Sequence, residues 1–201
     1  MEQYLKDTKF AVENLIRLIT EEENQIINLN DQLVLEKNKR KVLQDDFMRK
    51  ELDPDENFTE GDYFSSFYRQ AKYYEEIIKP MKDKIFICEK SINNKKHSIS
   101  SLSGAVLQIA KQGISIKFNG LKNCPTGRTV INGVVLKAII WHGRNQAMHY
   151  EEDIKNIDTI SCFNDLGFVT INNINLAKDV IDLLGWKTYI DYEADMISLI
   201  Q

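Results

Sequence analysis

Proline and glycine are scarce in this chain: its 201 residues include three prolines and nine glycines. Because these residues serve the tight turns between short strands, their scarcity argues against a many-turned β fold and favours helices. No apolar run approaches the roughly 18 residues that a membrane-spanning helix needs. The charged segment Met1–Phe10 lacks the apolar stretch of a secretory signal. We therefore expect a soluble, cytoplasmic, mostly helical protein that does not enter a membrane.

Several chemical signatures are also missing. Cys88, Cys124 and Cys162 are odd in number and far apart, which fits neither a disulfide framework nor a zinc site. No Gly-rich phosphate loop, Rossmann fingerprint or His-Glu-x-x-His motif occurs. We expect reduced thiols and neither a metal nor another cofactor.

Acidic residues are absent from the 61 residues between Lys90 and Tyr150. This segment holds nine Lys or Arg residues and all three histidines, whereas the rest of the chain has 17 basic and 30 acidic residues. Such a partition indicates a polyanion-facing surface on an acidic body, with Lys117, Lys122 and Arg128 as candidates for contacts to the RNA backbone. The alternative is that these lysines simply solvate helix faces.

The N-terminal half has the apolar repeat of paired helices. Residues 2–50 form one predicted helix, in which apolar residues recur every seven positions, and Leu52-Asp53-Pro54-Asp55 ends it. A second helix is expected to start near Thr59, with a kink at Pro80. Its apolar residues follow spacings of four and three from Phe67 through Tyr74, Ile78 and Ile85 to Ile109. Residues 1–112 are therefore predicted to form a long antiparallel helical hairpin.

Residues 113–201 are predicted to be a compact helical part that packs with the hairpin as one domain. Helices are expected from near Asn132 to Glu152, over 154–166, and over 176–184 with Gly185 as its end. Ile114, Ile116 and Phe118 alternate with polar residues as in a short strand, and Phe168–Ile171 fits a strand or a buried loop. The fold class is thus all-α, with one short β segment allowed.

The segment Trp141–Tyr150 places strongly polar residues in a helix that should face the core. Arg144 carries a forked donor that suits phosphate oxygens, and His149 can move a proton near neutral pH. Together they suit activation of an RNA 2′-hydroxyl and protonation of the leaving 5′-oxygen without a metal. The two differ in direction by about 140° on an ideal helix, so cooperation needs a wrapped Arg side chain or a distortion near Gly143. The alternative is a polar pair that ties helices together.

Arg144-Asn145-x-x-x-His149, late in an apolar helix, resembles the Arg-x4–6-His motif of the HEPN superfamily. The resemblance is close over residues 134–152 and loose over 60–185. It implies a helical bundle and a metal-independent RNA endonuclease that works as a homodimer, with two motifs meeting across one cleft, in a toxin or antiphage defence setting. It also implies that Arg144 stabilises the phosphate, that His149 is the general acid and base, and that Asn145 orients one of them.

The chain departs from this family in two respects. Its hairpin is longer than a minimal HEPN bundle needs, which favours a dimerisation arm or a binding surface for an antitoxin or other protein. Tyr150 directly follows His149, whereas toxins paired with nucleotidyltransferase antitoxins carry a Tyr two residues after the His. Two rival hypotheses are a non-catalytic coiled-coil scaffold and a HEPN module that binds RNA without cutting it. His142 either assists the RNA site or packs in the core.

Overall fold

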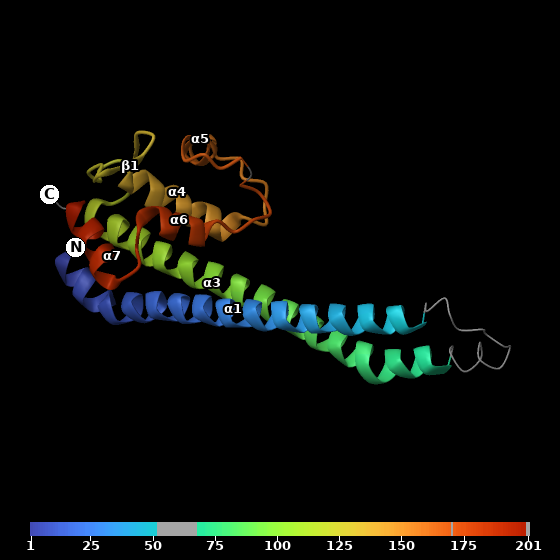
Figure 1. Cartoon of the computed structure of the whole chain (residues 1–201). Helices are drawn as coiled ribbons and strands as arrows, with labels where there is room; N and C mark the ends of the chain where they lie inside the picture. Colours follow the sequence, from blue (N-terminus) through green and yellow to red (C-terminus); the bar gives the residue numbers. More distant parts are fainter. Residues whose placement is uncertain (52–67, 170, 200–201) are drawn as a thin grey trace. The chain divides into compact units, whose positions relative to one another are not determined.

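The computed structural model describes residues 1–51, 68–169 and 171–199. It is mostly helical, which confirms the predicted all-α fold class (Figure 1). The elements are α1 (Glu2–Glu51), η1 (Tyr74–Ile78), α3 (Lys79–Phe118), β1 (Thr129–Ile131), β2 (Val134–Val135), α4 (Leu136–His149), α5 (Ile157–Asp165), α6 (Ala177–Leu184) and α7 (Tyr189–Ser198). Among the described residues, no helix has the length and apolarity to cross a membrane. The predicted helix start near Thr59 and the stop at Leu52–Asp55 lie outside the described residues.

The chain divides into two compact units. Their boundaries differ from the one expected near residue 112. One unit is Asn24–Lys95, and the other is Met1–Glu23 with Lys96–Gln201. The reason is that the first turns of α1 and the last turns of α3 bury apolar side chains within the second unit. These are Leu5, Val12, Ile16 and Ile19 of α1 and Val106, Leu107, Ala110 and Ile114 of α3.

In the unit Asn24–Lys95 the burial follows the predicted apolar repeat, with Ile78, Ile85 and Ile92 buried. The π-helix η1 ends at Ile78, two residues before Pro80, where a kink was predicted. Proline cannot donate the backbone hydrogen bond of a regular helix, and a π-turn accommodates that loss. The wider turn also changes the inward-facing residue: Tyr73, not Tyr74, lies inward and donates its hydroxyl hydrogen to Leu43 O at 2.7 Å.

The β structure lies at a different position from the predicted strand. The strand expected at Ile114–Phe118 is wrong, because α3 continues to Phe118 and its turn buries Ile114 while Ile116 is 69% exposed. A two-stranded hairpin forms instead from β1 and β2. Its turn, Asn132-Gly133, has positive φ at both residues, 48° and 82°, as a type I′ turn requires. Asn132 therefore turns a hairpin rather than capping a helix, and α4 begins at Leu136.

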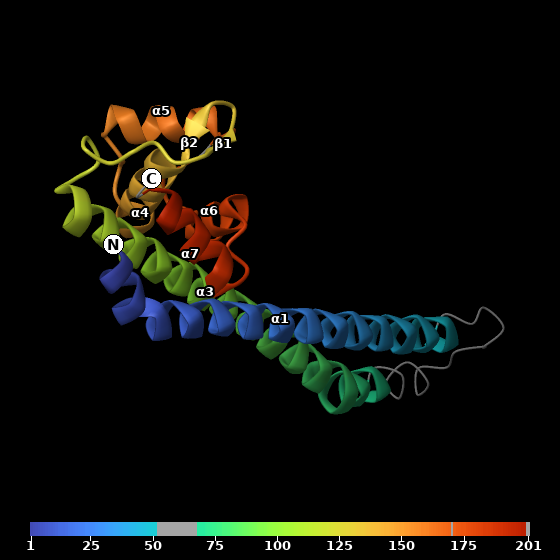
Figure 2. The same ribbon diagram turned by 90° about the vertical axis from the view of Figure 1, so that its left-hand side faces the viewer.

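Helix α4 is the centre of the second unit. Figures 1 and 2 show α4 between α3 and α5, and α6 also packs against it. Gly143 permits this approach, because a Cβ there would lie 2.9 Å from Val180 Cγ1. Helix α4 runs unbroken through Gly143 to His149, so the distortion considered at this glycine is absent from the described helix.

Gln146, inside the candidate motif, is fully buried and holds the segment that leads into α6. Its Nε2 donates to Ile171 O at 2.8 Å and to Ile174 O at 2.6 Å, and its Oε1 accepts from Leu176 N at 3.0 Å. We expect Gln146→Leu to lower the free energy of unfolding by about 2–4 kcal/mol, because it leaves three backbone groups without these partners. Urea denaturation measures the change. Met148→Leu, at an exposed position of the same helix, is the control, and equal stability of the two variants would contradict this role.

Candidate functional site

Arg144 lies on the face of α4 toward α3 and is half-buried. Its Nε donates to Oε1 of Gln108 on α3, and its Nη1 donates to Asn145 Oδ1 at 3.3 Å. In the described part of the chain, no carboxylate pairs with its guanidinium. Neutral amides therefore orient Arg144 and leave its charge available to an anion.

Lys111 brings a second cation to this face. It lies one turn after Gln108 on α3, and its Nζ is 4.5 Å from the centroid of the Trp141 ring. Burial lowers the pKa of Lys111, and the nearby charge of Arg144 lowers it further. The two cations are thus close enough to repel one another.

His149 is the last residue of α4, and its side chain is exposed. Its Nδ1 lies 3.6 Å from Glu152 Oε2, which makes an ion pair when the imidazole is protonated. The imidazole opens onto a pocket of about 620 Å³ between the end of α4 and the start of α5. The pocket is lined by Asn145, His149, Glu152, Asp153, Ile154, Lys155, Asn156 and Thr159. An exposed imidazole beside a polar pocket can exchange protons with a ligand placed there.

Asn145 is the residue that links the two candidate catalytic side chains. Arg144 reaches toward α3, whereas His149 contacts the segment after α4, so the two do not share a direct partner. Asn145 accepts a hydrogen bond from Arg144 and lines the pocket of His149. The site therefore has two neighbouring halves joined at Asn145. The cationic half is Arg144 with Gln108 and Lys111 of α3, and the imidazole half is His149 with its pocket.

His142 lies in the core, which favours its packing role over RNA contact. Only 9% of the residue is exposed, and its Nδ1 is 3.0 Å from Thr159 Oγ1. Since that hydroxyl donates to Asn156 Oδ1, the hydrogen of the His142–Thr159 bond belongs to Nδ1. Burial lowers the pKa of His142 and nearby Asp158 partly opposes this, so the neutral form is favoured. His142 thus ties α4 to α5.

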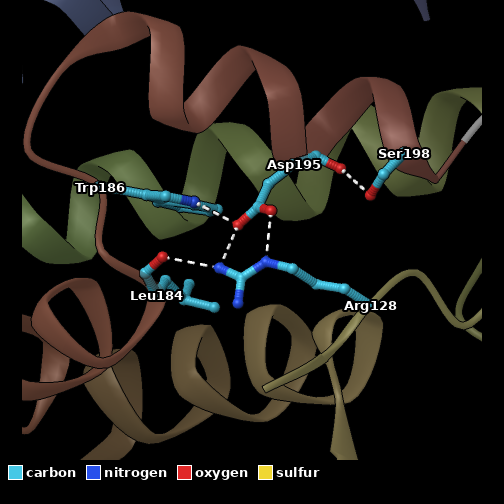
Figure 3. Close-up of polar contacts among 5 residues, drawn as sticks. All are labelled: Arg128, Leu184, Trp186, Asp195 and Ser198. Atoms are coloured by element: carbon cyan, nitrogen blue, oxygen red, sulfur yellow. Dashed lines mark hydrogen bonds and ion pairs between the residues drawn. The ribbon is translucent and has the colours of Figure 1, made fainter.

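Arg128, a predicted RNA contact, is held within the fold (Figure 3). Its Nε and Nη2 donate to the two carboxylate oxygens of Asp195 at 2.7 and 2.9 Å, and Nη2 also donates to Leu184 O at 2.7 Å. Trp186 Nε1 donates to Asp195 Oδ2 at 2.8 Å. The carboxylate raises the pKa of Arg128 and occupies its forked donors. Arg128 thus joins the segment before β1 to α6 and α7, a structural role that the sequence did not predict beside its expected RNA contact.

Lys117 and Lys122 are exposed, so both stay candidates for RNA contacts. Two residues of the cationic half, Gln108 and Lys111, were not singled out from the sequence as site residues. The available signal was their spacing of three on a helix in the acid-free segment, which places both side chains on one face. Their proximity to Arg144 depends on how α3 packs against α4, which the sequence pattern does not show.

Comparison of the chain with protein-family models, curated proteins and solved structures finds no match. The HEPN resemblance accordingly rests on the motif of α4 and on the helical architecture around it. The assignment therefore stays a prediction.

Proposed function

We propose that this chain is a metal-independent RNA endonuclease of HEPN type. The observation that supports it best is the position of Asn145. This residue contacts Arg144, whose charge has no carboxylate partner among the described residues, and it lines the pocket onto which His149 opens. A phosphate binder and a proton-transfer group are thereby adjacent on one helix, which is the pairing that phosphodiester cleavage needs.

The proposed reaction is an internal transfer of the RNA phosphate. His149 accepts the proton of the 2′-hydroxyl, the 2′-oxygen bonds to phosphorus, and the bond from phosphorus to the 5′-oxygen breaks. A protonated imidazole, from His149 or from a second copy, supplies the proton to the leaving 5′-oxygen. Arg144 donates to the non-bridging oxygens as their negative charge grows. The products are a 2′,3′-cyclic phosphate and a 5′-hydroxyl, and Asn145 orients the Arg144 side chain throughout.

The RNA would follow the acid-free segment on α3 and α4, with Lys117 and Lys122 contributing to backbone contacts. We further propose a homodimer in which two copies of the α4 motif line one cleft, as the HEPN resemblance implies. A second imidazole across the cleft would let one His149 act as base while the other acts as acid. Such an activity fits a toxin or antiphage defence component.

The direct test is expression of the wild-type chain, Arg144→Ala and His149→Ala in cells at matched levels. We expect growth arrest with RNA fragments that end in 2′,3′-cyclic phosphates for the wild type, and growth without fragments for both variants. Met148→Ala, at an exposed neighbouring position of α4, is the matched control and should arrest growth like the wild type. Equal behaviour of all four proteins would argue against cleavage by these residues.

A second candidate function, a protein-binding scaffold, is favoured by the unit Asn24–Lys95. Large apolar side chains are exposed there on both helices, and a shallow groove of about 280 Å³ lies between them. The exposed residues include Ile27, Val34, Leu35, Val42, Phe86 and Ile87. Such surfaces usually mark contacts with another helix or protein, here an antitoxin or a second copy. RNA fragmentation that depends on His149 would separate the nuclease from a scaffold alone.

A further inference from the structure

Lys111 and Arg144 bring two positive charges to the contact between α3 and α4, where Arg144 donates to Gln108 and Lys111 lies over the Trp141 ring. Both are half-buried, and they come from α3 and α4. Uncharged groups hold them: the Trp141 ring lies under the Lys111 ammonium, and the Gln108 and Asn145 side-chain oxygens accept from the Arg144 guanidinium. Like charges in a partly desolvated place repel each other: burial lowers the pKa of Lys111, and the charge of Arg144 lowers it further.

Carboxylates neutralise the part-buried Lys178 and the more exposed Arg128, whereas the part-buried Lys137 donates to the backbone oxygens of Leu121 and Cys124. Lys178 lies 2.7 Å from Glu23 and 2.5 Å from Asp182, and Arg128 is bound by Asp195. Among the residues that the structure describes, no carboxylate pairs with Lys111 or Arg144, and the segment from Lys90 to Tyr150 contains no Asp or Glu. An oxyanion placed between Lys111 and Arg144 would satisfy both charges and remove their repulsion.

We propose that Lys111 and Arg144 form a clamp for one phosphate of single-stranded RNA, with Gln108 and Trp141 as the residues that position the two cations. This deepens the proposed function and rests on it for the identity of the nucleic acid. A cationic site beside a partly exposed aromatic ring is the combination that single-strand-binding surfaces use, since the ring accepts a base as well. Lys111 is then a substrate-binding residue that takes no part in proton transfer, unlike His149.

The test measures binding separately from cleavage. The probe is a fluorescently labelled single-stranded 2′-O-methyl RNA, which lacks the 2′-hydroxyl and so cannot be cut by the proposed reaction. Binding to the full chain is followed by fluorescence anisotropy over a range of salt concentrations. The variants are Lys111→Gln, Lys111→Arg and the matched control Lys187→Gln at an exposed lysine between α6 and α7. Thermal unfolding by circular dichroism checks that each variant is folded.

We expect Lys111→Gln to weaken binding about tenfold at low salt, as loss of one phosphate contact does. The slope of log affinity against log salt should become shallower by about 0.7. Lys111→Arg should keep most of the affinity because it keeps the charge, and Lys187→Gln should match the wild type. Wild-type affinity and slope in Lys111→Gln would overturn the clamp, as would an equal loss in Lys187→Gln.

Two further measurements identify the ligand and distinguish phosphate binding by Lys111 and Arg144 from the proposed nuclease activity. Inorganic phosphate should displace the probe no better than chloride at equal ionic strength, whereas stronger displacement would show a site for free phosphate and overturn the RNA assignment. Lys111-dependent binding without cleavage of ordinary RNA would reject the nuclease and keep the clamp. Conversely, cleavage by Lys111→Gln with wild-type affinity and rate would keep the nuclease and reject the clamp.

Discussion

Replacement of His149 by alanine is expected to lower the rate of RNA cleavage by a factor of about 10²–10⁴, the usual contribution of a positioned acid–base group. The side chain is exposed at the end of α4, so the substitution removes the proton-transfer group without opening a core cavity. The measurement is the single-turnover rate on an RNA oligonucleotide with the purified chain in the presence of a chelator. The chelator itself should leave the wild-type rate unchanged, because the proposed reaction uses no metal.

Four further measurements make this result specific to chemistry. Met148→Ala should cleave at the wild-type rate, and the free energy of unfolding of His149→Ala should stay within about 0.5 kcal/mol of the wild type, as is usual for surface substitutions. Added imidazole should restore part of the lost rate of His149→Ala. Arg144→Lys, which keeps the charge but loses the forked donor, should also be impaired. Undiminished cleavage by His149→Ala would reject the assigned role.

Replacement of Arg128 by alanine is expected to lower the free energy of unfolding by about 2–4 kcal/mol, although the residue lies in the basic segment. The variant leaves the carboxylate of Asp195, a residue only 7% exposed, with Trp186 Nε1 as its remaining side-chain donor. It also removes the bond to Leu184 O, the last carbonyl of α6. This expected loss is at the lower end of the range for breaking a buried ion pair, because the Arg128 side chain is 42% exposed. Urea denaturation measures the change.

The exposed Lys122→Ala is the control for Arg128→Ala and should be nearly neutral for stability. A double-mutant cycle with Asp195→Asn should give a coupling free energy of about 1–3 kcal/mol between the two side chains. At temperatures where Arg128→Ala is folded, its affinity for single-stranded RNA should match the wild type. Weaker RNA binding at unchanged stability would instead restore Arg128 to the nucleic-acid surface.

Features that depend on neighbouring residues could be predicted from the sequence. The apolar repeat predicts the paired helices, because side chains at spacings of three and four share one helical face wherever the helix packs. Gly185 was expected to end α6, and it does so with a φ of 74° that glycine adopts without steric cost. The helix distortion at Pro80 follows from the missing backbone donor of proline alone.

Two errors arose where local signals compete. The three alternating apolar residues Ile114, Ile116 and Phe118 fit a strand and a helix equally well. Burial of Ile114 in the core decided for the helix. Asn132-Gly133 is the strongest short-range signal for a β-hairpin turn. Because an apolar run follows from Val134, the helix was nevertheless predicted to begin near Asn132. Burial of Ile114 thus decided the first case, whereas in the second the positive φ of Asn132 and Gly133 formed a hairpin turn before the helix.

By itself, the sequence determined the helical class, the paired heptad helices, the acid-free segment and the neighbouring positions of Arg144, Asn145 and His149 on one helix. Only the tertiary structure decided which cations are neutralised within the fold and which are not. Arg128 meets Asp195, 67 residues later in the chain, whereas Arg144 meets Gln108 and Lys111 on α3. The physical reason is that local periodicity assigns a side chain to a face of its own helix, while its charged partners depend on how distant helices pack.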